Sequence, residues 1–509
     1  MKMLLDHRGE PIRKSPTQIS HREYMAMKAK YDASSNDDFA LENHWLNTDN
    51  LDPHSANSYE VRKRLRSRSR YEIIENNPYL KGIALTLAND FIGSGPKLKI
   101  TDKRIPKEVA RNIEQRFMEW SKHINLRRKL WRLRLAKLVD GEGIGIFYSN
   151  RKEYPIKLDI DVIETDRISS EEVRPLLQPD EVDGIKFDRH GNPKKYFLLK
   201  HHPGSTQQNY TLQKREGNWV KAKWIIHWFR QDRGWLRGIP ETTPSLPLCA
   251  LLRRYTLAVV KAAESAAGFS VLLETDGPPS VVSYGDDDDP FDMFPISHGM
   301  MTTLPWGHKM KQLTPEHPMS VYDAFVDALL KEITRPLMVP FNIAGGTSKD
   351  SNMASAVVDA HIYKASGEQE RYHCEEEVLD ANVLPRWWEE AIRTPGYLQG
   401  GVIPSITAEN PTLQDSVPMH RWGWDRIGLD HTDPQKVANS LKTLRENKFI
   451  TDRWIQETYY NRDIEDWREE IEEDEDFRQK ITPEPVAPEP GQQQPGKNGQ
   501  PQQPGQSKK

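Results

Sequence analysis

The chain has 509 residues, and 71 Lys and Arg against 75 Asp and Glu leave a formal net charge of −4. That balance excludes an overall basic charge that would draw the whole protein to nucleic acid. Hydrophobic residues make up only 36% of the chain. We therefore expect several modest structural units, or a subunit stabilised by partner subunits, in place of one large core.

Two further features of the sequence indicate the compartment in which the protein is made. The N-terminus lacks an apolar stretch long enough for a signal peptide, so we expect a soluble protein made in a cytoplasm. The two cysteines, Cys249 and Cys374, fall in predicted helices far apart in the sequence. They indicate buried thiols in a reducing compartment, and neither a disulfide framework nor a metal site.

The first half of the chain predicts an arm followed by a mixed unit. Residues 1–57 are expected to form a partly disordered N-terminal arm, and residues 58–245 an α/β unit. A helical pattern over 59–92 is broken at Asn77-Pro78, because the residue before proline disfavours helix. Further helices are expected at 107–120 and 127–138, and strands at 156–163, 184–187, 196–199 and 224–229.

Two basic segments lie in this region. Residues 62–70 carry alternating Arg, Lys and Ser, and residues 127–137 interleave Arg and Lys with Leu and Trp. Either segment could touch phosphates. A solvated helix face, or pairing with acidic neighbours, is the interpretation we favour for both.

A long helix is predicted over residues 246–274. Its small side chains Ala258, Ala262 and Ala266 recur every four residues and would let another helix approach closely. An ordinary amphipathic core helix is the plainer alternative. A membrane span is not expected, because Lys261 and Glu264 interrupt the apolar run.

A Pro- and Gly-rich insert, a second helix and a loop follow. The insert covers 275–319, and its four consecutive aspartates at 286–289 lack the ligand spacing of a calcium loop, which favours a solvated acidic turn. Residues 320–335 predict a helix whose apolar face includes Phe325 and Leu329. Residues 336–351 predict a loop that lacks the phosphate-loop spacing, and its polar or glycine positions are Asn342, Gly345, Gly346, Thr347, Ser348 and Lys349.

The last part of the chain predicts more helix and then a tail. Residues 352–395 read as a very long helix that Pro385 kinks or ends. Residues 396–477 end in a mostly acidic stretch. Residues 478–509 are rich in Pro, Gln and Gly and should be disordered.

Two sets of side chains could form a catalytic or metal-binding site. Asp159, Asp161, Glu164 and Asp166 could assemble a two-metal nuclease site, although alternation along a half-exposed strand explains the first two more simply. His201, His202 and His227 could bind a metal, but no companion ligand spacing supports it. We predict no active site, no metal and no cofactor.

Short motifs recur along residues 58–476 in a specific order and spacing. They are LRSRSR (65–70), ENNPY (75–79), IGSG (92–95), LVDGEG (138–143), IHWFR (226–230), GWLRGIP (234–240), TDP (432–434) with Gly428 upstream, and NKFIT (447–451). Together they resemble the lambda-type family of bacteriophage portal proteins. The chain departs from the family at Asn447-Lys448, where a Gly turn is usual, which concerns the local connection between two helices.

This resemblance implies an α+β portal-type subunit. It would have an α/β wing (58–245), two stem helices (246–274 and 320–335), a small α/β clip (275–319) and a tunnel loop (336–351). A long wing helix (352–395) and a helical C-terminal wing and crown region (396–477) would follow. The stem would pack through Ala258, Ala262, Ala266, Phe325 and Leu329, and the tunnel-loop residues named above would face DNA.

The resemblance also implies a function. About twelve subunits would form the ring-shaped head–tail connector at one capsid vertex, the channel through which the terminase packages double-stranded DNA and through which DNA is later ejected. The terminase, not the portal, would hydrolyse ATP. The implied partners are the terminase large subunit, a head–tail adaptor, the major capsid and scaffolding proteins and the passing DNA, with no membrane. The alternative is a metal-dependent nuclease or another phage DNA-processing enzyme that uses the Asp159 cluster.

Overall fold

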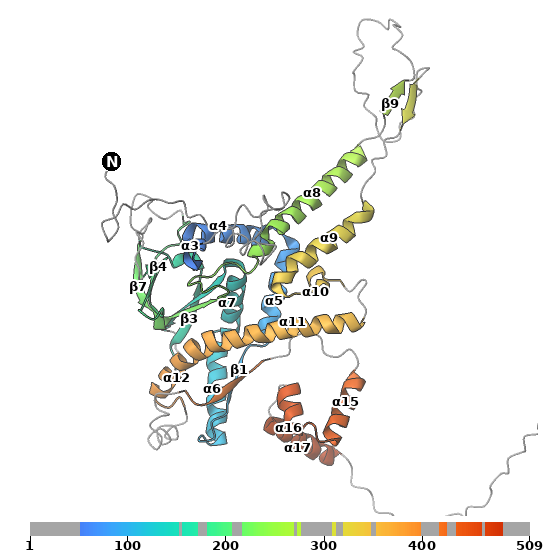
Figure 1. Cartoon of the computed structure of the whole chain (residues 1–509). Helices are drawn as coiled ribbons and strands as arrows, with labels where there is room; N and C mark the ends of the chain where they lie inside the picture. Colours follow the sequence, from blue (N-terminus) through green and yellow to red (C-terminus); the bar gives the residue numbers. More distant parts are fainter. Residues whose placement is uncertain are drawn as a thin grey trace, which may run out of the picture.

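The computed structural model describes residues 51–151, 155–171, 181–205, 216–268, 272–275, 308–311, 319–347, 353–398, 417–424, 434–460 and 464–481. Helices dominate it, and the sheets are small (Figure 1). The mixed helix and sheet content agrees with the α+β prediction. Several predicted features lie outside the described residues: the arm up to residue 50, the acidic run at 286–289 and the tail after Ile481. Residues 478–481, predicted to belong to the disordered tail, instead lie at the end of a helix.

A chain of helical segments opens the described part. These are α3 (Pro53–Ala56), α4 (Tyr59–Ser69), a π-helical segment (Arg70–Asn76) and α5 (Pro78–Ile92). The break at Asn77-Pro78 lies where the sequence predicts it. The Asn77 side chain caps α5 by accepting a hydrogen bond from the Leu80 backbone N–H (3.3 Å), and Pro78 fits the first turn, where no backbone donor is needed. Residues 51–57, expected in the arm, instead belong to the folded part, because α3 and the buried Asn57 pack there.

The body of the molecule combines two helices with two antiparallel sheets. The helices are α6 (Lys107–His123) and α7 (Leu126–Asp140). The first sheet has the order β3-β2-β8, formed by Leu158–Ile163, Glu142–Ser149 and Ile225–Phe229. The second has the order β4-β5-β6-β7, formed by Glu181–Val182, Ile185–Phe187, Pro193–Leu199 and Gly217–Lys221. All four strands expected here are present, each shifted by no more than three residues.

The main apolar core lies between α6, the first sheet and the C-terminal half of the long helical run. Phe117 contacts Trp387 edge-on at 5.1 Å, and Trp120 lies 6.3 Å from the same ring. The indole N–H of Trp120 donates to the carbonyl oxygen of Leu158 (3.0 Å), which satisfies its polar atom inside the core. A second cluster joins α5 to the helices that follow the sheets, and a third fills the space between the two sheets.

The pair of helices predicted around the insert is α8 (Leu246–Gly268) and α9 (Met319–Thr334). The prediction that the first helix reaches residue 274 is wrong, because Leu272–Thr275 form β9 and pair with β10 (His308–Lys311). Gly268 is a poor helix former, and the inter-strand hydrogen bonds satisfy the backbone that follows. Both helices run away from the body toward β9 and β10 (Figure 1).

The segment expected to be a loop at 336–351 is partly helical, which corrects the prediction. A 3₁₀ turn (Arg335–Leu337) is followed by α10 (Phe341–Gly345). Ala344 is buried, and Phe341 and Ile343 pack against the second cluster, so burial holds this turn in a helix. Its end lies at Gly346, whose φ of 62° is the left-handed conformation that glycine adopts without cost.

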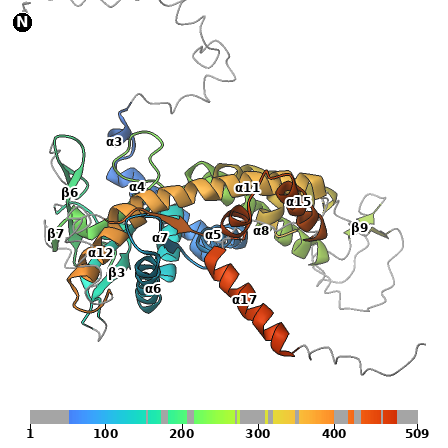
Figure 2. The same cartoon turned by 90° about the horizontal axis from the view of Figure 1, so that it is seen from below.

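The long helical run does not end at Pro385, although an end there is one of the two outcomes that the sequence predicts. Helix α11 (Met353–Cys374) continues through a π-helical segment (Glu375–Val383) into α12 (Leu384–Arg393), which crosses the molecule in Figure 2. Pro385 lies in the first turn of α12, where its missing N–H and fixed φ are tolerated. The wider hydrogen-bonding pattern just before it lets the helix continue past the proline.

The C-terminal elements form a strand and a helical module. β11 (His420–Gly423) pairs with β1 (Lys97–Ile100) and ties the end of the chain to the start of the body. The module contains α15 (Pro434–Glu446), α16 (Asp452–Trp454), a π-helical turn (Ile455–Tyr459) and α17 (Ile464–Ile481). Lys448 takes a φ of 58° between α15 and α16, so the turn forms without glycine at the cost of a strained backbone.

Candidate functional site

The α8–α9 pair is held together near its base. Leu252 of α8 and Val326 and Leu330 of α9 are buried in one cluster. Farther out, the Tyr255 ring stacks on Tyr322 with centroids 5.7 Å apart and meets Phe325 edge-on at 4.7 Å. The two helices therefore form one stiff unit anchored on the body.

The residues predicted to pack this pair divide into two groups. Phe325 contacts Tyr255 although its own side chain is 43% exposed, and Leu329 is half-buried against the same cluster. Ala258 and Ala262 are exposed, and the side chain of Ala266 lies outside the described residues. Within one chain the small-residue row thus remains open.

The predicted loop residues lie beside the base of α9. Asn342 and Gly345 belong to α10, and the Asn342 side-chain oxygen accepts a hydrogen bond from the Ile343 N–H (2.9 Å). The Thr347 N–H donates to the Asn342 carbonyl (3.2 Å), which closes the turn around Gly346. Ser348 and Lys349 lie outside the described residues. The turn that ends α10 is therefore centred on Gly346.

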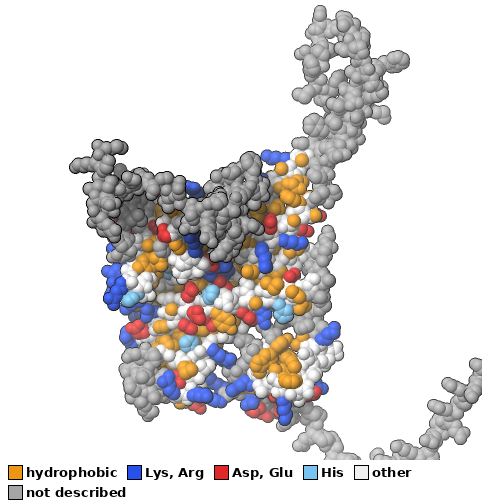
Figure 3. Space-filling model, in the orientation of Figure 1, with side chains coloured by type: hydrophobic (Ala, Val, Ile, Leu, Met, Phe, Trp, Pro, Cys, Tyr) orange, Lys and Arg blue, Asp and Glu red, His pale blue; other side chains and the backbone are white. Residues whose placement is uncertain are grey.

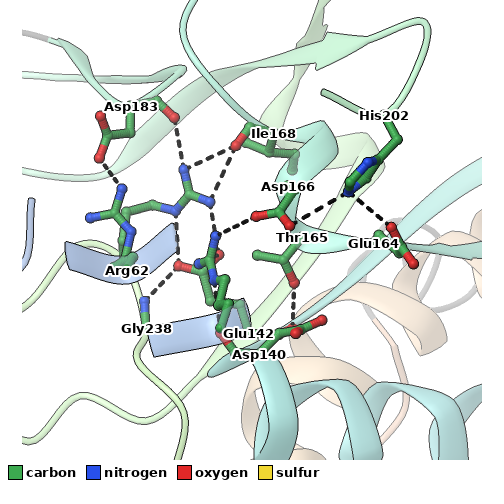
Figure 4. Close-up of polar contacts among 12 residues, drawn as sticks. Arg62, Asp140, Glu142, Glu164, Thr165, Asp166, Ile168, Asp183, His202 and Gly238 are labelled. Atoms are coloured by element: carbon green, nitrogen blue, oxygen red, sulfur yellow. Dashed lines mark hydrogen bonds and ion pairs between the residues drawn. The ribbon is translucent and has the colours of Figure 1, made fainter. Parts of the chain in front are cut away.

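A buried ion network that the sequence reading did not locate joins α4 to the sheets (Figure 4). Glu142, fully buried at the start of β2, accepts hydrogen bonds from Arg237 Nε (2.8 Å) and Nη2 (2.9 Å) and from the Gly238 N–H (2.5 Å). Arg66 approaches the same carboxylate at 3.2 Å. Burial alone would raise the pKa of Glu142, but Arg237 and Arg66 overcome it and hold that pKa well below its usual value.

The first basic segment supplies the other cations of this network. Arg62, Arg66 and Arg70 are spaced by four and therefore share one face of the helical run. Arg62 pairs with Asp183, and Arg70 binds Asp166 (2.7 Å). Burial is the main cause that lowers the pKa of Arg62 to about 10. The four-residue spacing was the available signal, and pairing with acidic neighbours explains these three arginines.

Glycine makes the close approach at this network possible. A Cβ on Gly238 would lie 2.1 Å from the Gly141 carbonyl oxygen, and one on Gly141 (φ 86°) would lie 2.2 Å from the Ile239 carbonyl carbon. Both glycines come from motifs singled out in the sequence. Their role is to bring two chain segments together around Glu142.

A second network ties α7 to α11. Arg134 binds Glu241 (3.0 Å) and Glu370 (3.4 Å), and Lys137 pairs with Glu370 while lying over the Trp228 ring. Burial alone would raise the pKa of Glu370, but Arg134 and Lys137 reverse this and lower it to about 2. Most cations of the second basic segment that these contacts involve are thus also paired with carboxylates of the same chain.

The carboxylates considered for a nuclease are already occupied by groups of the same chain. Asp159 pairs with Lys129 and accepts from Tyr148 (2.8 Å) and Asn150 (2.9 Å). Asp166 binds Arg66 and Arg70, whereas the side chain of Asp161 is exposed. This arrangement neutralises the cluster and does not aim it at a shared metal.

The histidines do not converge either. His202 contacts Glu164 (3.1 Å), whereas the buried His227 lies against Glu142 (3.6 Å) and the Tyr196 hydroxyl (3.3 Å). No set of three or more His, Cys, Asp or Glu side chains suited to a metal occurs among the described residues. Cys249 and Cys374 are buried and unpaired, as predicted. No described helix is long and apolar enough to cross a membrane.

These features define a structural subunit in which a stiff helical pair projects from an α/β body. The family described as phage portal protein, lambda family, matches residues 44–359. Since that match spans more than half of the sequence, the chain belongs to the lambda family of phage portal proteins. Its role is that of a portal protein, a structural protein of the phage virion.

Solved structures add more distant likenesses, and no curated protein matches. One is the virion of a native gene transfer agent (GTA) particle, at 12% identity and a TM-score of 0.35, covering 68% of this chain and 87% of that chain. The neck of the native GTA particle computed with C12 symmetry has 12% identity and a TM-score of 0.40, covering 76% and 91%. The neck of the empty particle computed with C6 symmetry has 11% and 0.40, covering 70% and 94%.

Proposed function

We propose that about twelve copies of this chain close into a ring at one capsid vertex and form the channel for double-stranded DNA. The family assignment supports this function. Within it, the projecting α8–α9 pair is the stem, β9 and β10 belong to the clip, and the body with the long helical run is the wing. The segment after α10 is the tunnel loop, and the C-terminal module lies toward the crown.

The observation that carries this proposal is the apolar surface left open along the projecting helices. Leu251 and Leu257 of α8 are each 51% exposed and Val260 is 49% exposed, and Ala258 and Ala262 are exposed on the same helix. Figure 3 shows hydrophobic side chains on the surface of the projecting α8. An exposed apolar surface of this kind marks an interaction site. Neighbouring stems in a ring would cover it.

A second open surface lies on α11. Val357, Val358 and Ile362 are all more than two-fifths exposed. Two separate surfaces on one subunit suit head-to-tail contacts, in which each copy presents different faces to its two neighbours and the rotation closes the ring. Such a ring also explains how a chain of low apolar content gains stability.

The partners follow from this role. The clip would face the terminase large subunit during packaging and the head–tail adaptor afterwards, while the wing and crown would face the capsid and scaffolding proteins. The protein would be made in the host cytoplasm and incorporated into the virion. ATP hydrolysis would belong to the terminase; Asp159 and Glu142 of this chain are both held in internal ion pairs.

The ring is tested by enlarging the small-residue row. Ala262→Leu should reduce ring yield in native mass spectrometry, because overpacking a close helix contact costs about 1–3 kcal/mol. Ala438→Leu, on an exposed position of α15, is the matched control and should leave the yield unchanged. Monomers or dimers only in the wild type, across concentration and salt, would contradict the assembly.

The tunnel loop is tested by shortening it. Deleting residues 346–349 should spare ring formation, because α10 keeps its packing, and should impair packaging or retention of DNA. Lys349→Ala should do less, since one exposed phosphate contact is a small, salt-screened interaction. Full-length packaging by the deletion variant would contradict the loop assignment.

A further inference from the structure

The cations of the second basic segment are not all used inside the chain. Lys129, Arg134 and Lys137 each pair with a carboxylate, and Arg132 donates to the Val162 carbonyl (2.8 Å). Arg127 and Arg128, at the start of α7, are exposed and form no ion pair with a described carboxylate. These two side chains remain available for a ligand.

Both arginines line a cleft of about 1260 Å³. Its walls come from the turn at 93–96, β1, the end of α6, the start of α7 and, on the opposite side, α17. The charged side chains along it are five Lys and Arg against two Glu: Lys97, Lys99, Lys122, Arg127, Arg128, Glu114 and Glu470. Lys99 lies 3.5 Å from Glu114, and these two charges offset each other. The other four cations outnumber the one remaining carboxylate, so the net charge of these side chains is positive.

The turn beside the two arginines belongs to the IGSG motif (92–95), which has no part in the proposed channel. Gly95 has a φ of 98°, and a Cβ there would lie 3.5 Å from the Arg127 Cβ, so the glycine turn lies directly against that side chain. On the other side, Trp131 donates its indole N–H to Asn89 (2.9 Å). The first turn of α7 contains no acidic residue, so its dipole adds to the positive potential.

We propose that this cleft is a second DNA-binding site, on the wing, that contacts the sugar-phosphate backbone of double-stranded DNA. The identity of the ligand rests on the proposed role in DNA translocation. Unpaired guanidinium groups bind phosphate oxygens through paired donors, which suits Arg127 and Arg128. The contact is independent of sequence and weakens steeply with salt.

The acidic helix α17 does not fill this site. Trp467 and Glu470 are its residues along the cleft, and in the described part of the chain none of its carboxylates pairs with Lys122, Arg127 or Arg128. The carboxylate of Glu470 beside the cleft, on a helix rich in Glu and Asp, opposes the approach of the DNA polyanion. Binding is therefore weak and releasable, as DNA that must keep moving requires.

The test measures binding of a short fluorescein-labelled DNA duplex to assembled rings by anisotropy over a salt series. Arg127→Gln with Arg128→Gln should lower the slope of log K against log salt by about 1.8, which corresponds to two phosphate contacts. Arg64→Gln with Arg68→Gln removes the same charge from exposed positions of α4 and should leave the slope unchanged. Native mass spectrometry of each variant separates loss of this site from failure of the ring itself.

Three results would overturn the proposal. Equal losses in both double variants would mean that only net charge matters. An unchanged slope in the cleft variant would mean that the arginines do not bind DNA, and if α17 also became more sensitive to protease, the cleft would be a latch for that helix. Wild-type rings that bind no duplex would exclude the site altogether.

Discussion

Replacing Glu142 by Gln removes one negative charge from the most enclosed ion network of the protein while keeping the shape of the side chain. The carboxylate is 0% exposed and lies within 3.2 Å of two guanidinium groups, those of Arg237 and Arg66. The amide can still accept from the Gly238 N–H, but Arg237 then keeps a buried charge without this carboxylate, whereas Arg66 retains Asp166 at 3.2 Å. Removing one member of a buried pair costs roughly 3–5 kcal/mol.

Urea unfolding followed by circular dichroism, at one fixed protein concentration, measures this free energy. Glu164→Gln is the matched control, because that side chain is 63% exposed and contacts His202 at 3.1 Å. A surface pair of this kind contributes under about 1 kcal/mol. If Glu142→Gln unfolded within about 1 kcal/mol of the wild type, the network would not be a major source of stability and the reasoning from burial would be refuted.

Glu142→Gln should also change how the free energy of unfolding depends on pH. The pKa of Glu142 is lower in the folded than in the unfolded chain. Its stabilisation is therefore complete above the unfolded pKa of about 4.3 and is lost as the pH falls toward the folded value. Wild-type protein should lose more stability than Glu142→Gln on acidification below about pH 4. Parallel curves for the two proteins would contradict the assignment.

Three further outcomes are expected. Burial lowers the pKa of His420, but its hydrogen bond to Asp380 outweighs this and raises that pKa above its usual value. The β1–β11 connection should therefore weaken as the pH rises through the raised pKa. A change in Trp422 fluorescence would report this weakening, and Asp380→Asn should abolish it. Lys448→Gly should relieve the positive φ and stabilise the α15–α16 turn by about 1 kcal/mol, which slower amide exchange there would reveal and unchanged exchange would contradict. Deleting residues 482–509 should leave ring formation intact, and a truncated chain that stays monomeric would show that the tail is part of the assembly.

Local chemistry let the sequence predict much of the fold. The Asn77-Pro78 break follows from the geometry of proline and an asparagine cap, both of which act within a few residues. The strands β3, β5, β6 and β8 follow from alternation and turn residues. The family could likewise be inferred from short motifs in order, because their residues are adjacent in the chain.

Predictions failed where distant residues decide local structure. Helix α10 forms inside an expected loop because Ala344 is buried against helices from elsewhere in the chain. The long helical run passes Pro385 because Trp387 and Trp388 are locked into the core around α6. β9 exists because a strand more than thirty residues later pairs with it.

The sequence by itself determined the class of protein, the order of its elements and the presence of two basic segments, since these depend on near neighbours. Only the tertiary structure decided what those basic residues do. The first basic segment pairs its Arg62, Arg66 and Arg70 with carboxylates up to 121 residues away in the sequence. The second leaves Arg127 and Arg128 lining a cleft. Charge pairing depends on distance in space, and distance in space is set by packing that no local pattern contains.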